Sequence, residues 1–194
     1  VCVGLAGEAI IVGRTDAERT GANPLGRHDS FLGTRRSGAA HQEWGVQWGT
    51  PNDDYATGVV LEPSGSVVVA SIEGYNPFPP VSPRAVLTKW RPDHTVEWSS
   101  PWGSAGGERV TDLARDESGH FYVVGWTGGD LVGTNAGGYD GFMTKLSPTG
   151  SVVWSVQFGS SADDLAIVWD LSNTQPPVLL QGHQGDVTSL SWSP

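Results

Sequence analysis

The chain has 194 residues, a net charge of −10 and a single cysteine, Cys2. Its 11 lysines and arginines are scattered, which argues against a nucleic-acid-binding face, and one cysteine excludes an internal disulfide or a paired-cysteine metal site. The chain is 38% hydrophobic and has nine tryptophans, too apolar for a disordered linker, yet it has no apolar run of 18 residues, so no membrane span is predicted.

A unit of similar sequence recurs three times through the first 160 positions. Its first block starts with a glycine at residues 7, 65 and 119, so that successive copies are offset by 58 and 54 residues. The three blocks lie at 7–13, 65–71 and 119–125, then at 29–35, 84–90 and 140–146, and then around Trp44, Trp98 and Trp154. Self-similarity at this period indicates an array of one supersecondary unit.

Each unit contains four short apolar runs separated by turn-forming residues. In the second unit these runs lie at 58–61, 67–69, 85–87 and 96–98. Runs of this length, rich in Val, Phe, Tyr and Trp, predict strands, and long stretches at helical spacing are lacking. We therefore predict an all-β fold, a β-propeller of four-stranded antiparallel blades at 1–50, 51–104 and 105–160 with a partial fourth blade at 161–194, all within one structural domain.

The repeated blocks resemble the SBBP repeats of bacterial seven-bladed propellers. The third copy carries the resemblance best, in the order Gly119, Gly125, Asp140, Phe142, Lys145, Leu146, Trp154, Gln157 and Gly159. The second copy has Pro83-Arg84-Ala85 where the family keeps Gly and Asp, and the first lacks the Lys-Leu pair. The resemblance implies a propeller from a secreted or cell-surface bacterial protein of undefined activity.

The last 34 residues resemble a WD40 repeat instead. Trp169-Asp170 and Gly182-His183 stand in the order of that family, with strands expected at 165–171, 177–181 and 187–192. The resemblance implies a cytoplasmic protein. It also implies a buried tetrad of hydrogen-bonded residues that braces each blade. Trp169, Asp163 and Ser161 match three of its four positions. The histidine expected upstream is replaced by Tyr139 and Asp140, and His183 precedes a blade whose own tryptophan does not follow.

The two repeat types meet out of phase near residues 160–164. In the first family 151–158 is the last strand of a blade, whereas in the second Asp163 precedes a third strand. Either 151–158 serves as the second strand of a WD40-like sheet, or the joint arose by recombination. We favour a chimeric origin, which leaves the hypothesis of a fragment or chimera without a selected function.

Closure of the ring is not decided by the number of strands. About fifteen are expected, whereas four blades need roughly sixteen. An open arc and a small closed ring therefore both stay open as interpretations. An open arc would expose blade faces and strand edges, which favours self-association.

Neither a catalytic nor a metal-binding constellation is predicted. Carboxylates recur at equivalent turns, at 53–54, 108 and 163–164, and recurrence in every unit favours turn capping over catalysis or calcium binding. Asp112 and Asp116 lack calcium-loop spacing, and the five histidines lack metal-ligand spacing. We therefore expect no enzyme activity, cofactor or metal.

The candidate binding surface lies in the loops between the second and third strands. These loops, at 15–28, 73–83 and 127–139, differ in sequence while the strands around them repeat. Trp48, Trp102 and Trp126 are the candidate exposed rings. The sequence thus predicts a non-enzymatic scaffold for protein or other macromolecular partners, without nucleic acid or membrane. The alternative is a carbohydrate-binding or carbohydrate-active propeller that uses exposed tryptophans and carboxylates.

Overall fold

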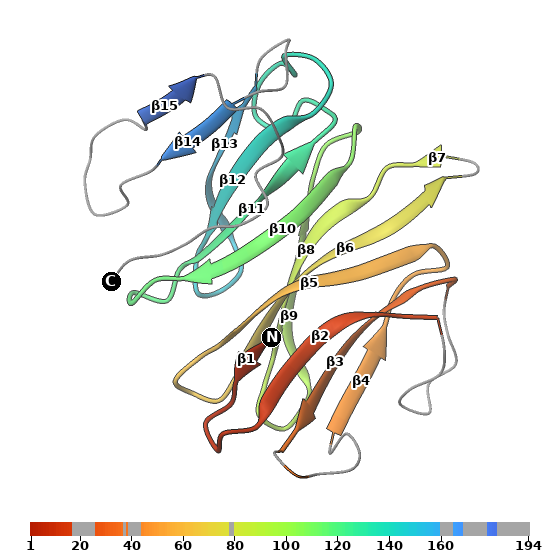
Figure 1. Cartoon of the computed structure of the whole chain (residues 1–194), viewed down its shortest axis with the longest axis vertical. Coiled ribbons are helices and arrows are strands. Elements are labelled where there is room, and N and C mark those ends of the chain that lie inside the picture. The colour runs from red at the N-terminus through yellow and green to blue at the C-terminus, as the bar shows by residue number, and fades with distance from the viewer. Residues whose placement is uncertain are drawn as a thin grey trace.

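Three antiparallel sheets follow one another along the chain in a computed structural model (Figure 1). The structure describes residues 1–16, 26–36, 38, 44–77, 80–159, 165–168 and 178–181. Sheet 1 has the order β1-β2-β3-β4, at Cys2–Val3, Ala9–Thr15, Asp29–Arg35 and Trp44–Trp48. Within these described ranges every element is a strand.

Sheets 2 and 3 repeat the order of sheet 1. Sheet 2 consists of β5 (Asp53–Leu61), β6 (Val67–Pro77), β8 (Arg84–Trp90) and β9 (Val96–Trp102), with the short β7 (Pro80–Val81) paired to the end of β6. Sheet 3 consists of β10 (Glu108–Arg115), β11 (Phe121–Thr127), β12 (Asp140–Leu146) and β13 (Val152–Phe158). A separate hairpin pairs β14 (Leu165–Val168) with β15 (Val178–Gln181).

The prediction of an all-β chain with four antiparallel strands per unit is confirmed. Strands expected at 165–171 and 177–181 correspond to β14 and β15, and 187–192 lies outside the described residues. The two-residue β7 was not expected, because it forms only where the end of β6 extends beyond its partner β8. The described residues show no closed ring, and they contain no helix suited to crossing a membrane.

The glycine that opens each repeat has a conformational role. Gly7, Gly65 and Gly119 have φ angles of 80°, 83° and 86°, a region that side chains disfavour. Each lies in the turn between the first and second strand of its sheet and donates its N–H to a carbonyl three residues earlier. The same turn before each second strand explains why these glycines recur. The hairpin turn that the sequence predicts at Asp116 is present.

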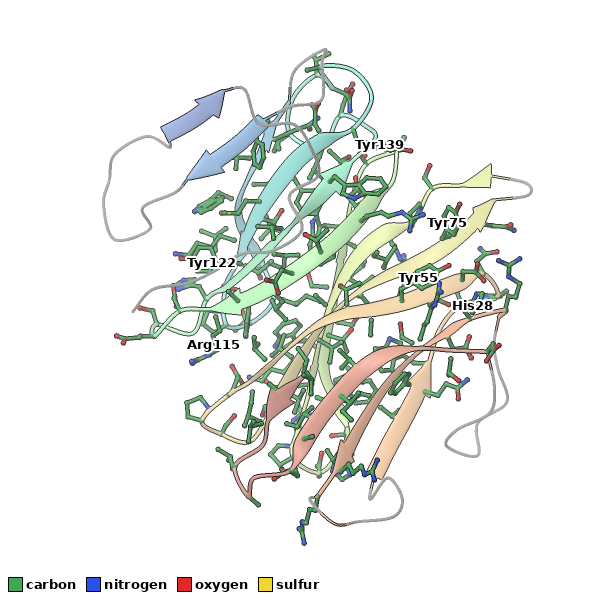
Figure 2. The ribbon with its side chains drawn as sticks, viewed as in Figure 1. His28, Tyr55, Tyr75, Arg115, Tyr122 and Tyr139 are labelled. Carbon is green, nitrogen blue, oxygen red and sulfur yellow. The ribbon has the colours of Figure 1, made fainter. Side chains whose placement is uncertain are left out.

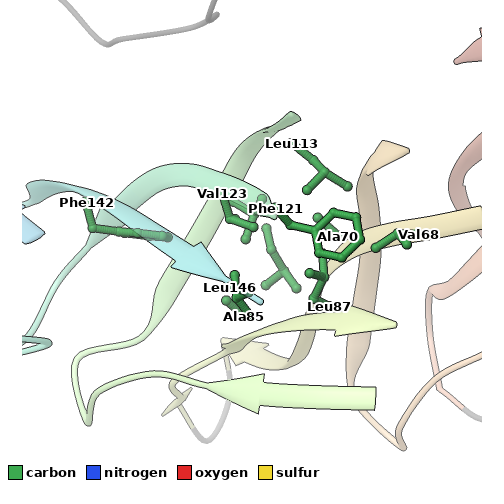
Figure 3. Close-up of a cluster of buried hydrophobic side chains, with 11 residues drawn as sticks. Val68, Ala70, Ala85, Leu87, Leu113, Phe121, Val123, Phe142 and Leu146 are labelled. Carbon is green, nitrogen blue, oxygen red and sulfur yellow. The ribbon is translucent and has the colours of Figure 1, made fainter. Parts of the chain in front are cut away.

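Two apolar clusters hold the three sheets together. One joins sheets 1 and 2 and includes Ile10, Leu32 and Val69, and β5 lies against β2 and β3. The other joins sheets 2 and 3, where β10 lies against β5 and β6. Figure 3 shows this second cluster, in which Leu87 from sheet 2 meets Phe121 from sheet 3.

The ends of the first strands carry a repeated ion pair. In sheet 2, Glu62 Oε2 lies 2.7 Å from Lys89 Nζ, and Arg115 of sheet 3 approaches Glu62 at 3.9 Å. In sheet 3, the matching pair is Asp116 and Lys145, at 3.8 Å. Sheet 1 has neither member of the pair. By strand register and turn position, Gly4 stands in place of the acid and Thr34 in place of the lysine.

Candidate functional site

The site lies at the end of the sheets where second strands finish and third strands begin. The antiparallel register pairs Thr15 with Asp29, Glu73 with Arg84 and Thr127 with Asp140, one pair in each sheet. Figure 2 shows His28, Tyr55, Tyr75 and Tyr139 along this side, with Tyr122 and Arg115 on the opposite side. The described parts of the three predicted loops therefore share one end, while 17–25 and 78–79 lie outside the described residues.

Aromatic rings and guanidinium groups meet across the boundary between sheets 2 and 3. The Arg109 guanidinium lies 4.7 Å from the ring centre of Tyr75 on β6 and 5.3 Å from that of Trp126 on β11. Trp126 in turn contacts Tyr139, with ring centres 4.3 Å apart. Cations over aromatic faces contribute about 0.5–2 kcal/mol each, so these contacts orient Arg109. No carboxylate of the described residues is paired with it in an ion pair.

A second group of the same kind lies between sheets 1 and 2. Arg14 on β2 lies 5.1 Å from the Tyr55 ring on β5, and His28 lies 6.1 Å from Tyr55, centre to centre. The two groups adjoin because Asp53, beside Tyr55, is paired in register with Tyr75. We refer to the combined surface as the aromatic–arginine row, which consists of Arg14, His28, Tyr55, Tyr75, Arg109, Trp126 and Tyr139.

Asp53 anchors the first half of the row. Its carboxylate lies 3.1 Å from His28 Nδ1 and accepts hydrogen bonds of 3.2 Å from both Arg27 and the Tyr55 hydroxyl. Burial raises the pKa of Asp53, but the hydrogen bonds from His28 and Tyr55 and the charge of Arg27 outweigh it, so the pKa is lowered. Asp53 therefore stays ionised and holds the two rings in place.

Two buried carboxylates brace the loops that lead into the first strands. Asp54 accepts hydrogen bonds from the Thr50 and Gly74 N–H groups, at 2.6 and 2.9 Å. Glu108 accepts bonds from the Ser104 N–H and hydroxyl, at 2.7 and 2.6 Å. Both carboxyl groups are 0% exposed. The two acids thus satisfy loop donors, which supports the interpretation of recurring acids as turn caps, whereas 163–164 lies outside the described residues.

The same braces explain the glycine that follows each fourth strand. A methyl group at Gly49, Gly103 or Gly159 would overlap the carboxylate of Asp54, Glu108 or Asp140, respectively. Glycine is therefore required where the chain passes against a buried acid.

Stability should fall as the pH rises from about 4 to 7, because of Asp54. Burial, with a smaller contribution from the charge of Glu73, raises the pKa of Asp54 from 3.8 to about 6, and the hydrogen bonds from Thr50 and Gly74 offset this only in part. A raised folded-state pKa gives stability that is complete below the unfolded pKa and lost as the pH passes through the folded pKa. The expected loss is on the order of 2 kcal/mol.

Urea unfolding at several pH values from 4 to 7 measures this loss. Asp53 and Asp116, whose pKa values are lowered, act in the opposite direction, so the parent is compared with Asp54→Asn. The difference between the two curves isolates Asp54. Parallel curves across this range would show that Asp54 does not take up a proton there.

A second brace joins the third and fourth strands in sheets 1 and 3. Gln47 Nε2 donates to Asp29 at 2.9 Å, and Gln157 Nε2 donates to Asp140 at 2.8 Å. In sheet 2 both positions are changed together, to Arg84 and Pro101. Arg84 instead approaches Glu73 at 3.6 Å.

The three predicted tryptophans have different environments. Trp48 packs on the cluster between sheets 1 and 2, with its ring centre 5.4 Å from that of Trp90. Trp102 packs on the cluster between sheets 2 and 3, and the indole nitrogens of both Trp48 and Trp102 are buried. Trp126 alone of the three belongs to the row. Trp48 and Trp102 occupy matching positions, each at the end of a fourth strand and directly before a glycine. Their side chains point toward the core.

The other sequence-predicted residues fall into two groups. Ser161, Asp163, Trp169, Asp170 and His183 lie outside the described residues. Within the described ranges, no three His, Cys, Asp or Glu side chains gather closely enough to hold a metal ion.

No protein-family model and no curated protein matches this chain. The repeat resemblances therefore rest on the residues themselves.

Sequence reasoning missed Arg14, Tyr55 and Arg109, whereas Tyr75 lies within the predicted loop 73–83. One signal pointed to them. Arg14 stands at a repeat position that holds Ile72 and Trp126 in the other sheets, and Tyr55 matches Arg109. Where otherwise similar units have different residues at one position, the shared fold does not determine the residue type there.

Proposed function

We propose that this protein is a non-enzymatic binding scaffold of the β-propeller type, which binds a protein or other macromolecular partner through the aromatic–arginine row. The observation that carries the proposal is the position of Arg109 between Tyr75 of sheet 2 and Trp126 of sheet 3. Side chains from different repeats form one surface there. Tyrosine, tryptophan and arginine are also the residues most enriched among binding hot spots.

The carboxylates near the row support binding rather than catalysis. Asp54 and Glu108 are buried and accept hydrogen bonds from their own loops. Asp53 is engaged by Arg27, His28 and Tyr55. General acid–base work requires a carboxyl group that reaches a substrate proton, whereas these three serve the loops and rings around them.

The sheets also support the proposed relationship to SBBP-type repeats. In that proposal the three sheets are blades, and the tail from residue 161 onward is a partial WD40 repeat joined to them. The first relationship suggests an extracellular or cell-surface location and the second a cytoplasmic one. The sheets pack in chain order through equivalent faces, as neighbouring blades do.

Carbohydrate binding is the alternative that a specific observation favours. Tyr139 is 60% exposed and adjoins Trp126, so the two rings offer an aromatic surface to solvent. Sugars stack their apolar faces on such rings. In this alternative Trp126 and Tyr139 dominate binding, and Arg109 contributes less.

Replacing Arg109 or Trp126 with alanine should weaken partner binding at least tenfold. A displayed library of random 12-residue peptides, screened against the purified chain, supplies ligands whose Kd is then measured by biolayer interferometry. A parallel glycan array tests the alternative. A tenfold rise in Kd corresponds to a loss of about 1.4 kcal/mol of binding free energy, which is common at a hot spot.

Arg91→Ala is the matched control, because Arg91 follows β8 at the other end of sheet 2, where it contacts Glu97. This variant should bind as tightly as the parent. Peptides that bind all three variants equally, or a screen that enriches none, would contradict the proposal. Glycan binding that Trp126→Ala abolishes and Arg109→Ala spares would favour the alternative.

A further inference from the structure

Arg14 and Arg109 differ from six other basic side chains of the described residues in what surrounds their charge. Arg14 lies 5.1 Å from the ring centre of Tyr55, and Arg109 lies 4.7 Å from that of Tyr75. Within the described ranges, neither guanidinium forms an ion pair with a carboxylate. A carboxylate does pair with each of Arg27, Arg84, Lys89, Arg91, Arg115 and Lys145. Both exceptions belong to the aromatic–arginine row.

The carboxylates beside the row are already paired with other residues. Asp53 pairs with Arg27 and His28, and Glu73 pairs with Arg84. The charges of Arg14 and Arg109 are therefore not neutralised by these two acids. On a chain whose net charge is −10, the row thus has two cations that a carboxylate from another molecule can reach.

The contacts of the two arginines suit a carboxylate partner. A guanidinium that stacks on a ring uses its flat face, whereas its N–H groups point outward in the plane, where they match the two oxygens of a carboxylate. The rings of Tyr75 and Trp126 both contact Arg109, so its side chain is ordered before a partner binds. A side chain that is already ordered loses less entropy on binding.

Two exposed acids at the same end of the sheets limit how many negative charges a partner can have. Asp16 follows β2, and Asp130 follows β11 and accepts a hydrogen bond from the Asn135 N–H at 2.7 Å. Neither is paired with Arg14 or Arg109 among the ion pairs of the described residues. Both would repel a dense polyanion. A few separate carboxylates, with apolar groups between them for the rings, fit this surface better.

We propose that the partner of the aromatic–arginine row is an acidic peptide segment, in which two carboxylates pair with Arg14 and Arg109 and apolar side chains pack on the rings between them. The inference rests on the proposed function, because it names the partner of the same surface. Tyr55 and Tyr75 lie on paired strands (Figure 2), so the two arginines are about 10–20 Å apart. An extended peptide rises about 3.3 Å per residue, so its acidic residues should lie roughly three to six positions apart.

The peptides that the library screen enriches are the probe for this proposal. They should have two Asp or Glu residues at such a spacing more often than the unselected library does. Replacing both acids of a peptide with Gln should raise its Kd about fivefold or more, because two charge pairs are lost. For the unmodified chain, raising NaCl from about 0.05 to 0.5 M should remove most of the difference between the two peptides, since salt screens exposed charges.

A charge exchange on the protein tests the pairing directly. Arg109→Glu should bind the acidic peptide more weakly than the parent does, and it should bind a version of that peptide with Lys at both acidic positions more tightly than the parent does. The matched control is Arg91→Glu, which changes the net charge equally at the other end of sheet 2 and should keep the preference of the parent. The salt and Gln measurements need no variant of the protein.

Peptides that bind through Trp126 but show no enrichment of acids, or whose Gln versions bind as tightly, overturn this inference and leave the proposed scaffold function standing. A screen that enriches no peptide overturns both. A loss of preference in Arg91→Glu equal to that in Arg109→Glu would mean that net charge alone acts, which also overturns the inference. Heparin, a dense polyanion, should displace the peptides only weakly, and efficient displacement would point to an anionic polysaccharide instead.

Discussion

Replacing Phe121 with alanine should lower the free energy of unfolding by about 3–5 kcal/mol. Phe121 is fully buried in the cluster between sheets 2 and 3 and contacts Trp98 edge-on, with ring centres 6.0 Å apart. The change would leave a cavity bounded by residues from both sheets, including Leu87 and Leu146. Guanidinium chloride unfolding, followed by tryptophan fluorescence, measures the loss.

Two valines provide a matched internal control. Val123→Ala, at 0% exposure beside Phe121, should cost about 1–2 kcal/mol, and Val153→Ala, at 52% exposure, should cost less than about 0.5 kcal/mol. If Phe121→Ala destabilised the chain no more than Val153→Ala does, the cluster would not be what joins sheets 2 and 3.

Replacing Lys89 with methionine should destabilise the chain by about 3 kcal/mol. The side chains of Lys89 and Glu62 are only 13% and 9% exposed, and their charged atoms lie 2.7 Å apart. Without Lys89 the Glu62 carboxylate would stay buried, with Arg115 at 3.9 Å as its nearest remaining cation. Urea unfolding at pH 7 measures the loss.

Adding Glu62→Gln to Lys89→Met should recover more than half of that loss, since the buried charge is then gone as well. Sheet 1 already lacks both charges at these positions, where it has Gly4 and Thr34. A double variant no more stable than Lys89→Met alone would mean that the unpaired Glu62 carboxylate is not the source of the loss.

The strands could be predicted because their signal is local and repeated three times. Val67, Val68 and Val69 are β-branched and follow a turn glycine, and Phe121–Thr127, which is rich in aromatic residues and valine, also follows one. Five residues connect the first and second strands in each sheet, whereas longer loops connect the second and third strands. β7 could not be predicted, since it depends on how far β6 extends beyond β8 rather than on its own residues.

The row could be predicted only in part, because it is made by residues distant in sequence. The sequence predicts the loops and names Trp126 among the candidate rings, yet the contact of Arg109 with Tyr75 depends on how sheet 3 sits against sheet 2. Trp48 and Trp126 are the same residue type, and composition does not distinguish a packed indole from one beside a cation. Only the face on which each lies makes that distinction.

The paired replacements at the braces have a consequence for how the repeats can change. Asp29–Gln47 and Asp140–Gln157 each lie within one sheet, and sheet 2 lacks both members of the pair. A whole sheet can therefore be duplicated or exchanged without leaving half of such a pair in its neighbour. What an incoming sheet must match is the apolar face on either side, together with the glycine that lies against the buried acid of the next sheet. Whether a unit fits thus depends only on the surfaces of the two units that it contacts, as in repeat proteins whose stability is a sum over repeats and the interfaces between neighbours.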